Sequence, residues 1–250
     1  MELINKPTVV RGTLSVKQKI YLTPHYIRII LEGEDLKLFS GVSVGANNKI
    51  FIPSKESGQP MVRRTYTLRA LDLKAGEMFV DFVAHGDEGP ASGWAMKAQP
   101  GDILEVAMKD RSKALFPAAA AWFLLAGDHT ALPVISVILE TLPATAEGIA
   151  IIHVTAQEDI LSINTSSRVK ISWIIGDQHE DLLSVAVRSI PLPSTENKFV
   201  FAAAETNTIS NLRNYFKEAG ITKEQLSAYA YWKFGNSEDN SEMERRNEAK

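Results

Sequence analysis

The sequence predicts two domains of different class, an antiparallel β-barrel or sandwich followed by an α/β unit built on a parallel sheet. In the first half, short runs rich in β-branched and aromatic residues alternate with turn signals, which is typical of antiparallel all-β domains. From residue 118 onward, nearly continuous apolar strands alternate with helical segments, which indicates a buried parallel sheet. We therefore expect one domain over residues 1–117, a second over 118–236 and a charged tail over 237–250.

The strands expected in the first domain are short and end at proline, glycine or polar loops. They are predicted over Val9–Val16, Tyr26–Leu31, Lys49–Pro53, Arg63–Arg69, Met78–Ala84 and Ile103–Met108. Gly89 and Pro90 form a tight turn, after which Ala91–Ala98 is expected to form a helix.

The second domain begins with the apolar run Ala118–Ala126, which ends at Gly127. Helices are predicted over Thr130–Leu142, Leu182–Ile190 and Ile209–Ala219, and further strands over Ile149–Thr155, Val169–Ile175, Phe199–Ala203 and Ala228–Phe234. The tail is almost entirely polar and charged, so we expect a frayed helix or disorder there.

Composition excludes several classes of function. The chain of 250 residues is 45% apolar and 23% charged, as in ordinary soluble globular proteins, and its net charge of −3 provides no global basic field for nucleic acid or an anionic membrane. The absence of cysteine excludes disulfides, thiol catalysis and thiolate metal sites, and fits a reducing cytoplasm. The N-terminus lacks the pattern of a secretory signal, and no apolar run reaches about 18 residues. We expect a cytoplasmic protein without a membrane or nucleic-acid partner.

The stretch Arg63–Arg69 carries three arginines, a tyrosine and two threonines in seven residues. In an extended strand, Arg63, Thr65, Thr67 and Arg69 share one face, and Arg64, Tyr66 and Leu68 share the other. Arginines hold phosphates, a tyrosine ring stacks on a flat heterocycle and a threonine hydroxyl reaches a ring heteroatom. This pattern indicates a planar anionic ligand, and the alternative is a solvated edge strand with mixed charges.

Two turns before helices are candidate anion sites. In the first, Ser92 lies near the start of the helix after Gly89-Pro90, where main-chain N–H groups and the serine hydroxyl can hold a pyrophosphate. An ordinary strand–turn–helix with Ser92 as a cap is the alternative. In the second, Gly127 and Asp128 end the first apolar strand of the α/β domain, the place where dinucleotides bind. That helix is apolar nearly all round, which packing alone would also produce.

The five histidines lie far apart in the sequence and form no local metal motif, so no metal site is predicted. His85 differs from the other four in lying beside a glycine turn. No nucleophile elbow, phosphate-binding P-loop or Cys-His pair is present, which argues against hydrolase and kinase chemistry.

Several motifs in this order resemble the siderophore-interacting protein family, flavin-dependent ferric-siderophore reductases of the ferredoxin-reductase-like superfamily. The motifs are Arg64-x-Tyr66-Thr67-x-Arg69, Asp81-Phe82-Val83-x-His85-Gly86, Gly89-Pro90-Ala91-Ser92-x-Trp94-Ala95, Pro100-Gly101-Asp102, Leu125-Ala126-Gly127-Asp128-x-Thr130-Ala131-Leu132-Pro133 and Tyr231-Trp232-Lys233-x-Gly235. The resemblance extends from about residue 8 to residue 236. It implies an antiparallel six-stranded FAD-binding barrel followed by a parallel-sheet nicotinamide-binding domain.

The resemblance also implies roles for individual residues. Arg64 would hold the FAD pyrophosphate, and Arg69 would support a phosphate or the ribose. Tyr66 would stack on the isoalloxazine and Thr67 would hydrogen-bond near the flavin N5, which makes these two the catalytic candidates. Further FAD contacts are expected at Leu68, Asp81, Val83, His85, Ala91 and Ser92.

Nicotinamide binding is expected at Gly127, Asp128, Thr130 and Glu205. The chain departs from the family pattern at His129, where glutamate is usual, and at Ala204, where glycine is usual. Gln157, Glu158 and Asp159 follow a predicted strand without a nearby lysine or arginine, and a carboxylate there suits a free ribose 2′-hydroxyl. The sequence therefore favours NADH over NADPH.

The predicted reaction passes electrons from NAD(P)H through FAD to siderophore-bound Fe(III) and releases Fe(II) in the cytoplasm. The resemblance places Lys49 and Lys233 at basic positions of the family, so they are the predicted contacts to an anionic ferric siderophore. Arg63 and Lys55 are lesser candidates, the alternative for each of the four is a solvated surface charge, and a monomer is expected. The alternatives are a flavin reductase with another electron acceptor, a siderophore- or flavin-binding protein without catalysis, and a two-domain scaffold.

Overall fold

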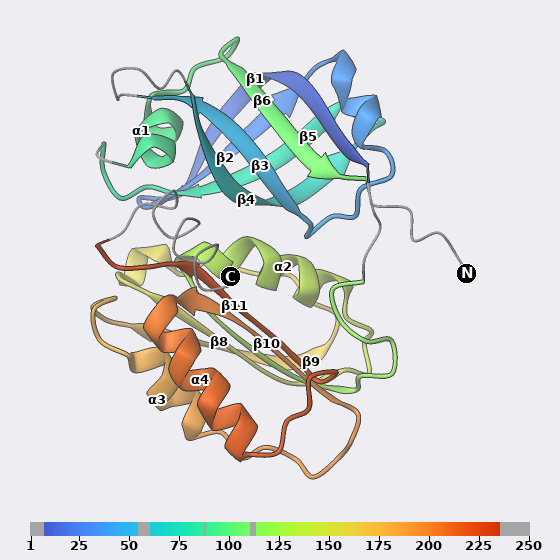
Figure 1. The fold of residues 1–250 in the computed structure, drawn as a ribbon, viewed down its shortest axis with the longest axis vertical. Coiled ribbons are helices and arrows are strands. Elements are labelled where there is room, and N and C mark those ends of the chain that lie inside the picture. The colour runs from blue at the N-terminus through green and yellow to red at the C-terminus, as the bar shows by residue number, and fades with distance from the viewer. Residues whose placement is uncertain (1–7, 55–60, 88, 111–113, 236–250) are drawn as a thin grey trace, which may run out of the picture. The chain divides into compact units, whose positions relative to one another are not determined.

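The computed structural model describes residues 8–54, 61–87, 89–110 and 114–235. The chain divides into two compact units, Met1–Leu115 and Phe116–Lys250, drawn in Figure 1. The predicted boundary after residue 117 lies two residues from this division. Two predictions lie outside the described residues. They are the substrate contact predicted for Lys55 and the frayed or disordered segment predicted for the tail 237–250.

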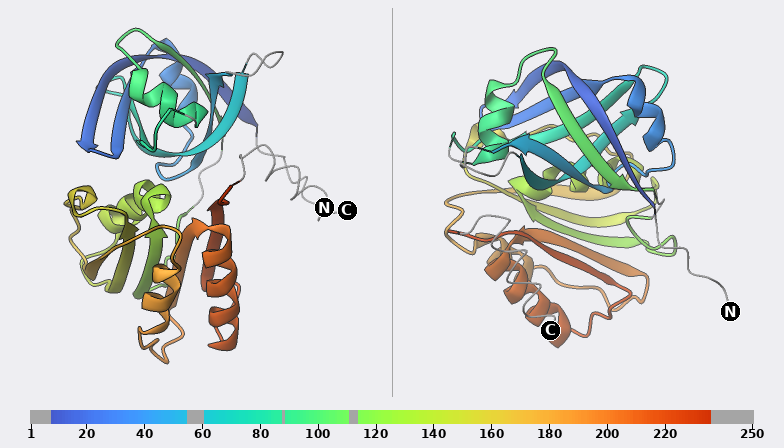
Figure 2. Two further views of the ribbon diagram at one scale, coloured as in Figure 1. Left: turned by 90° about the vertical axis from the view of Figure 1, so that its left-hand side faces the viewer. Right: turned by 45° about the horizontal axis from the view of Figure 1, so that its top comes forward.

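Unit 1 is a closed six-stranded antiparallel barrel, visible end-on in Figure 2. Its strands follow the order β1-β2-β5-β4-β3-β6 around the wall, which leaves no edge strand open for pairing with another chain. The strands are β1 (Val9–Thr23), β2 (Tyr26–Glu32), β3 (Asn47–Pro53), β4 (Met61–Asp72), β5 (Glu77–Val83) and β6 (Ile103–Lys109). A 3-10 helix, η1 (Glu34–Phe39), and the helix α1 (Pro90–Lys97) complete this unit. The sequence left barrel and sandwich open, and the barrel is the observed architecture.

The main departure from the predicted strands is β1, which continues seven residues beyond Val16. Lys17, Gln18 and Lys19 do not read as a strand by themselves, but this segment pairs with β2 as far as the pair Thr23 and Tyr26. Tertiary pairing therefore decides the length of β1, as it commonly does for β-strands.

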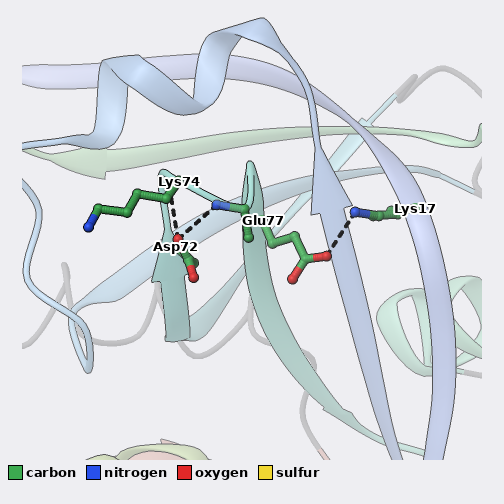
Figure 3. A network of polar contacts seen from close by, with 5 residues as sticks. Lys17, Asp72, Lys74 and Glu77 are labelled. Carbon is green, nitrogen blue, oxygen red and sulfur yellow. Dashed lines mark hydrogen bonds and ion pairs between the residues drawn. The ribbon is translucent and has the colours of Figure 1, made fainter.

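The hairpin between β4 and β5 is held by the carboxylate of Asp72 (Figure 3). Its Oδ1 accepts hydrogen bonds from the N–H groups of Lys74 at 2.8 Å and Ala75 at 2.9 Å, and these bonds lower the pKa of Asp72. Lys17 of β1 donates to Glu77 of β5 at 2.8 Å, also drawn in Figure 3. These contacts fix the register of the two strands that carry most of the predicted cofactor residues.

Unit 2 is a five-stranded parallel sheet in the order β11-β10-β7-β8-β9. Its elements are β7 (Trp122–Asp128), η2 (His129–Ala131), α2 (Leu132–Thr141), β8 (Glu147–Val154), η3 (Gln157–Asp159), β9 (Arg168–Ile175), α3 (Leu182–Arg188), β10 (Lys198–Glu205), α4 (Thr206–Glu218) and β11 (Leu226–Trp232). One face of the sheet packs against α3 and α4 through Leu124, Val200 and Phe216. This is the α/β unit that the sequence predicted.

Several predicted boundaries in unit 2 differ from the structure, and α4 begins three residues earlier than predicted, at Thr206. The helix expected from Thr130 begins as the 3-10 turn η2 and becomes α-helical at Leu132. The apolar run from Ala118 becomes a strand only at Trp122. The last strand lies two residues earlier than predicted, because Leu226 already pairs with Val200 of β10.

Candidate functional site

The outer face of β4 carries the side chains that the sequence grouped together. Cross-strand pairs place Thr67 opposite Asn47, Thr65 opposite Lys49, and Arg63 opposite Phe51. The intervening residues Arg64 and Tyr66 lie opposite Ile50 and Asn48, which are both fully buried. The alternation predicted for this strand is therefore confirmed, and the two faces of β4 carry different side chains.

A β-bulge interrupts the pairing of β4 with β5 between Leu68 and Ala70. Arg69, at the bulge, directs its guanidinium to the outer face, where its Nε lies 3.8 Å from Oδ2 of Asp81. A bulge re-aims a side chain in this way, and bulges are frequent beside functional sites. Leu68 itself is fully buried, its N–H donates to Ala46 and its carbonyl accepts from Gly45, so it contributes packing rather than a polar contact.

Asp81 is shared by two arginines, of which sequence reasoning missed one. Arg28 of β2 lies directly opposite Asp81 and makes a two-bond fork, with both donor–acceptor distances at 2.8 Å. The Asp81 side chain is only 1% exposed, against 20% for Arg28 and 15% for Arg69. Two guanidinium groups thus lie beside one buried carboxylate, and guanidinium groups are well suited to bind phosphate. The one arginine in the apolar run of β2 was the signal that could have identified Arg28.

Tyr26 lies beside the same cluster and was also not predicted. Its side chain is 1% exposed and its hydroxyl has no hydrogen-bond partner among the described residues. Burial raises the pKa of Tyr26 well above its ordinary value, and the nearby Asp81 carboxylate raises it further. The phenol is therefore a neutral, buried hydrogen-bond donor next to Arg28, Arg69 and Asp81.

Tyr66 is half-buried at the inner side of β4. Its ring packs on Phe82 with centroids 4.4 Å apart, and Phe82 in turn packs on Trp94 of α1 at 5.7 Å. This aromatic series fixes the orientation of the Tyr66 ring. Beside it, Thr67 is only 4% exposed and its hydroxyl makes no hydrogen bond to another described residue, which leaves it available to a ligand atom.

The turn from β5 into α1 is closed by Ser92. The Ser92 hydroxyl accepts from the N–H of His85 at 2.9 Å and donates to the carbonyl of Gly86 at 2.8 Å, and Ser92 is 1% exposed. The N-cap of α1 is Gly89, so Ser92 is not the cap considered from the sequence. The hydroxyl is committed to the turn, and an anion would meet main-chain N–H groups of the first helical turn instead.

His85 and Gly89 are matched across this turn. A Cβ on Gly89 would lie 2.6 Å from Cε1 of the His85 ring, so a larger residue at position 89 would require the exposed imidazole to move away from the helix start. His85 is exposed, Val83 is half-buried and Ala91 is buried. The predicted FAD residues of unit 1 come from β4, β5, the turn after β5 that carries His85, and the first turn of α1.

These residues fit FAD by their chemistry. The fit rests on the two guanidinium groups beside Asp81, the available hydroxyl of Thr67 and the fixed ring of Tyr66. Cations suit a pyrophosphate, a hydroxyl suits a ring heteroatom and an aromatic ring suits the flat heterocycle.

At the carboxyl end of β7, Asp128 has both carboxylate oxygens engaged. Oδ1 accepts from the N–H and the hydroxyl of Thr130 at 2.9 and 2.6 Å, and Oδ2 accepts from the indole of Trp232 at 2.7 Å. Asp128 therefore ties the end of β7 to the end of β11, which positions Trp232 and the adjacent Lys233. Gly127 is needed for packing, since a Cβ there would lie 2.5 Å from Ala131.

Glu205 has a similar structural role at the end of β10. Its Oε2 caps α4 by accepting from the N–H groups of Asn207 and Thr208, and its Oε1 accepts from the N–H of Phe234 at 3.3 Å. Asp128 and Glu205 thus brace the carboxyl edge of the sheet, where dinucleotides bind in open α/β sheets.

The two departures from the family pattern are accommodated inside unit 2. His129 lies 3.6 Å from Asp159, measured from Nε2 to Oδ2, and both side chains are almost fully buried. Ala204 is 2% exposed and packs in the core beneath α3 and α4. Asp159 is buried against His129, whereas Glu158, which also follows β8, is exposed.

The residues predicted to bind the ferric siderophore, which is the electron acceptor, lie in both units. Lys49 donates to Thr65 and, with Arg63, lies on the same outer barrel face as Thr67. Lys233 follows β11 in unit 2. Among the described residues, no group of three or more histidine, aspartate or glutamate side chains could hold a metal ion, and no helix has the length and apolarity to span a bilayer.

Comparisons with known proteins identify both units. Residues 55–109 match the siderophore-interacting FAD-binding domain, and residues 120–235 match the siderophore-interacting protein model. The chain is 31% identical over 252 residues to the ferric vibriobactin reductase ViuB of Vibrio cholerae, with 93% of each chain covered. The crystal structure of the siderophore-interacting protein SipS from Aeromonas hydrophila superposes with a TM-score of 0.85 at 29% identity, covering 96% of this chain and 98% of that one.

A more distant likeness concerns the fold alone. A ferredoxin NADP+ reductase from Neisseria gonorrhoeae, 13% identical, matches with a TM-score of 0.63 over 89% of this chain and 99% of that chain. The barrel followed by a parallel sheet is therefore a ferredoxin-reductase-like fold. By its sequence, its motifs and its architecture, the chain belongs to the siderophore-interacting protein family of FAD-binding proteins.

Proposed function

We propose that this protein is a ferric-siderophore reductase that passes electrons from NADH or NADPH through FAD to iron(III) held in a siderophore. The observation that carries the proposal is the outer face of β4. Along it, the Arg69–Asp81–Arg28 cluster is followed by the available hydroxyl of Thr67 and then by the cations Lys49 and Arg63. The outer face of β4 thus offers some of the contacts for the cofactor at one end and contacts for an anionic acceptor at the other, and the proposed cofactor contacts Arg64 and Tyr66 come from the other face of the strand.

In this proposal the residues of the chain bind and orient. Arg64 and Arg69 hold the phosphates, Tyr66 holds the flat ring and the Thr67 hydroxyl donates a hydrogen bond at its reactive edge. FAD, when bound, supplies the chemistry of accepting a hydride and releasing electrons singly. Lys49 and Arg63 hold the negatively charged ferric complex beside that edge, and oxygen ligands retain iron(II) less tightly than iron(III), so reduction releases the metal.

The nicotinamide cofactor is proposed to bind at the carboxyl edge of the unit 2 sheet, near Gly127, Asp128, Thr130 and Glu205. Glu158 is exposed there and no lysine or arginine occurs between residues 155 and 167. A free ribose 2′-hydroxyl suits this environment better than a 2′-phosphate. We therefore propose NADH as the preferred reductant.

The test uses the protein loaded with FAD under anaerobic conditions. NADH and NADPH are added separately, followed by a ferric siderophore and a chelator that traps iron(II). We expect NADH to bleach the oxidised flavin band and the ferric siderophore to restore it with formation of trapped iron(II). Thr67→Ala should slow flavin reduction or reoxidation, whereas Arg168→Gln, at an exposed ion pair in unit 2, should leave both unchanged.

Two results would contradict the proposal in different ways. A flavin band that persists with either nucleotide would indicate a binding protein without reductase activity. Flavin that is reduced by NADH and reoxidised by ferricyanide, but not by any ferric siderophore, would indicate a flavin reductase with another acceptor.

A further inference from the structure

We propose that the buried pair of His129 and Asp159 is a positioning pair for dinucleotide recognition in unit 2. It fixes the turn after β8 so that the exposed carboxylate of Glu158 meets the ribose of the adenosine half and excludes a 2′-phosphate. The proposal rests on the proposed function and adds the residues that decide between NADH and NADPH. The sequence singled out His129 and Asp159 for separate reasons, but not as partners.

The order of the strands places this pair at the ligand crevice of unit 2. From β7 the chain runs outward through β8 and β9, and it then returns to β10 on the other side of β7. Ligands of open α/β sheets bind where the strand order reverses in this way, at the carboxyl ends of the strands. His129 lies in η2, directly after β7, and Asp159 lies in η3, after the neighbouring strand β8. The pair therefore connects the turns that follow the first two strands of the sheet.

The His129 side of the pair is held in place by its neighbours in the chain. The Asp128 carboxylate accepts hydrogen bonds from the N–H and the hydroxyl of Thr130, the residue on the other side of His129. The same carboxylate accepts from the indole of Trp232 at the end of β11. The main chain around the imidazole is thus fastened across the carboxyl edge of the sheet, which makes η2 a fixed support.

The Asp159 side of the pair lies in a turn whose main-chain hydrogen bonds are local. The N–H of Asp159 donates to the carbonyl of Ala156 at 3.1 Å, and the N–H of Ile160 donates to Gln157 at 3.3 Å. The Asp159 carboxylate reaches further, because its Oδ2 lies 3.6 Å from Nε2 of His129. A fully buried carboxylate requires a partner, so this contact sets where the turn lies relative to β7.

A fixed position for Asp159 also fixes the residue before it. Glu158 is exposed, and no lysine or arginine occurs between residues 155 and 167. In a dinucleotide-binding βαβ unit, an acidic residue beyond the first turn hydrogen-bonds the ribose 2′-hydroxyl of NADH, whereas a nearby arginine accommodates the 2′-phosphate of NADPH. Discrimination between the two therefore depends on where the turn holds Glu158, and hence on the buried pair.

The simpler interpretation is that the pair only stabilises unit 2. Breaking it would then lower the free energy of unfolding, as the loss of one partner of a buried pair does, and would leave the relative affinity for the two dinucleotides unchanged. The proposal requires that ratio of affinities to change, and a purely structural role does not move it.

The experiment uses fragments without the nicotinamide ring, so that no electron transfer takes place. The FAD-loaded protein is titrated calorimetrically with adenosine 5′-diphosphoribose and with the same compound carrying a 2′-phosphate. We expect the wild type to bind the unphosphorylated fragment at least about tenfold more tightly, the factor that a hydrogen bond to a charged group supports. Glu158→Gln, a change of an exposed side chain, should reduce this preference to about threefold or less.

Changes to the buried pair test its positioning role. His129→Ala and Asp159→Asn should each reduce the preference to the level of Glu158→Gln. His129→Gln keeps a nitrogen donor for Asp159 and should retain more of the preference than His129→Ala. In the His129→Ala background, Glu158→Gln should have little further effect, because the two residues act through one contact.

The matched control is Arg168→Gln. It breaks the ion pair between Arg168 and Glu147 at the starts of β9 and β8, which is the opposite edge of the sheet. The preference for the unphosphorylated fragment should be unchanged in this variant. Hydrogen exchange checks the fold, because amides of β8 and β10 should stay protected in His129→Ala while those of residues 156–160 exchange faster. If His129→Ala fails to fold, Asp159→Asn and Glu158→Gln carry the test.

Equal affinity of the wild type for the two fragments would overturn the proposal, and so would the failure of both fragments to bind. A preference that survives unchanged in Asp159→Asn and His129→Ala would mean that the pair only stabilises the fold. A preference that depends on the pair, in a protein whose flavin NADH does not reduce, would support the positioning pair and refute the reductase activity. The failures of the two proposals are therefore distinguishable.

Discussion

The Arg28–Asp81 fork makes a quantitative prediction about the barrel. Asp81→Asn keeps the shape of the side chain but removes the charge that holds Arg28 and Arg69 together. The structure places Asp81 at 1% exposure with two charge-assisted hydrogen bonds of 2.8 Å. Removing one partner of a buried ion pair costs about 3 to 5 kcal/mol, and because Arg28 keeps a fifth of its exposure we expect about 3 kcal/mol.

Hydrogen exchange provides the assay, because it reports the two units separately. In Asp81→Asn, the free energy of opening for amides in β2 and β5 should fall by about 3 kcal/mol, which raises their exchange rates roughly a hundredfold. The exchange rates of amides in β7 and β10 should remain unchanged. The comparison variant is Glu77→Gln, which breaks the more exposed pair with Lys17 and should cost at most about 1 kcal/mol.

The double variant Arg28→Met with Asp81→Asn tests the cause of that loss. If the loss comes from an uncompensated buried charge, removing Arg28 as well should cost less than the sum of the two single changes. The reasoning would be refuted if Asp81→Asn cost no more than Glu77→Gln, or if the single effects simply added.

Three further predictions concern unit 2. Asp128→Ala leaves the indole N–H of Trp232 without its acceptor, so β11 should lose about 1 to 3 kcal/mol of protection with a changed tryptophan emission; unchanged emission would contradict this. Asp181→Ala removes the side-chain cap of α3 and should cost about 1 kcal/mol at neutral pH. Burial alone would raise the pKa of Asp181, but hydrogen bonds to its carboxylate outweigh this and lower the pKa below its ordinary value of 3.8. The stability that Asp181 contributes is therefore present above that pH and is lost as the pH falls further. A stability difference between wild type and variant that persisted in acid would count against this. Gly148→Ala would place a Cβ 1.9 Å from a main-chain oxygen of β7 at a φ of +139°, so a loss above about 3 kcal/mol is expected in thermal unfolding, and an unchanged melting temperature would be inconsistent with the structure.

Much of the fold followed from local pattern. The apolar periodicity of β7, β8 and β10 and the turn glycines between strands sufficed for the class of each unit, because burial on one or two faces leaves a readable pattern. Where the sequence misled, long-range pairing was the cause. β1 extends past Val16 because β2 pairs with it, and β11 is displaced because β10 sets its register.

The candidate site was predictable where one strand carries several functional groups. The alternation of β4 placed Thr67, Thr65 and Arg63 on one face, and the structure confirms that arrangement. Arg28 and Tyr26 were missed because they meet Asp81 only through strand pairing. Asp128 and Glu205 were predicted from the motifs as cofactor contacts, but their carboxylates accept hydrogen bonds from neighbouring protein groups. A motif residue can therefore hold the site together without contacting a ligand.

The pair of His129 and Asp159 illustrates a further limit of reading sequence alone. The two residues follow different strands, and the sequence gives no sign that they are partners. Only the parallel pairing of β7 with β8 brings the ends of those strands side by side.

The central claim, electron flow from a nicotinamide through FAD to siderophore iron, is tested most directly by anaerobic stopped-flow spectroscopy of the FAD-loaded protein. We predict that NADH bleaches the flavin within the mixing experiment and that a ferric siderophore then restores the oxidised spectrum, with two iron(II) ions trapped for each NADH consumed. Reduced flavin that stays reduced in the presence of ferric siderophore, or flavin that NADH and NADPH both fail to reduce, would contradict the claim.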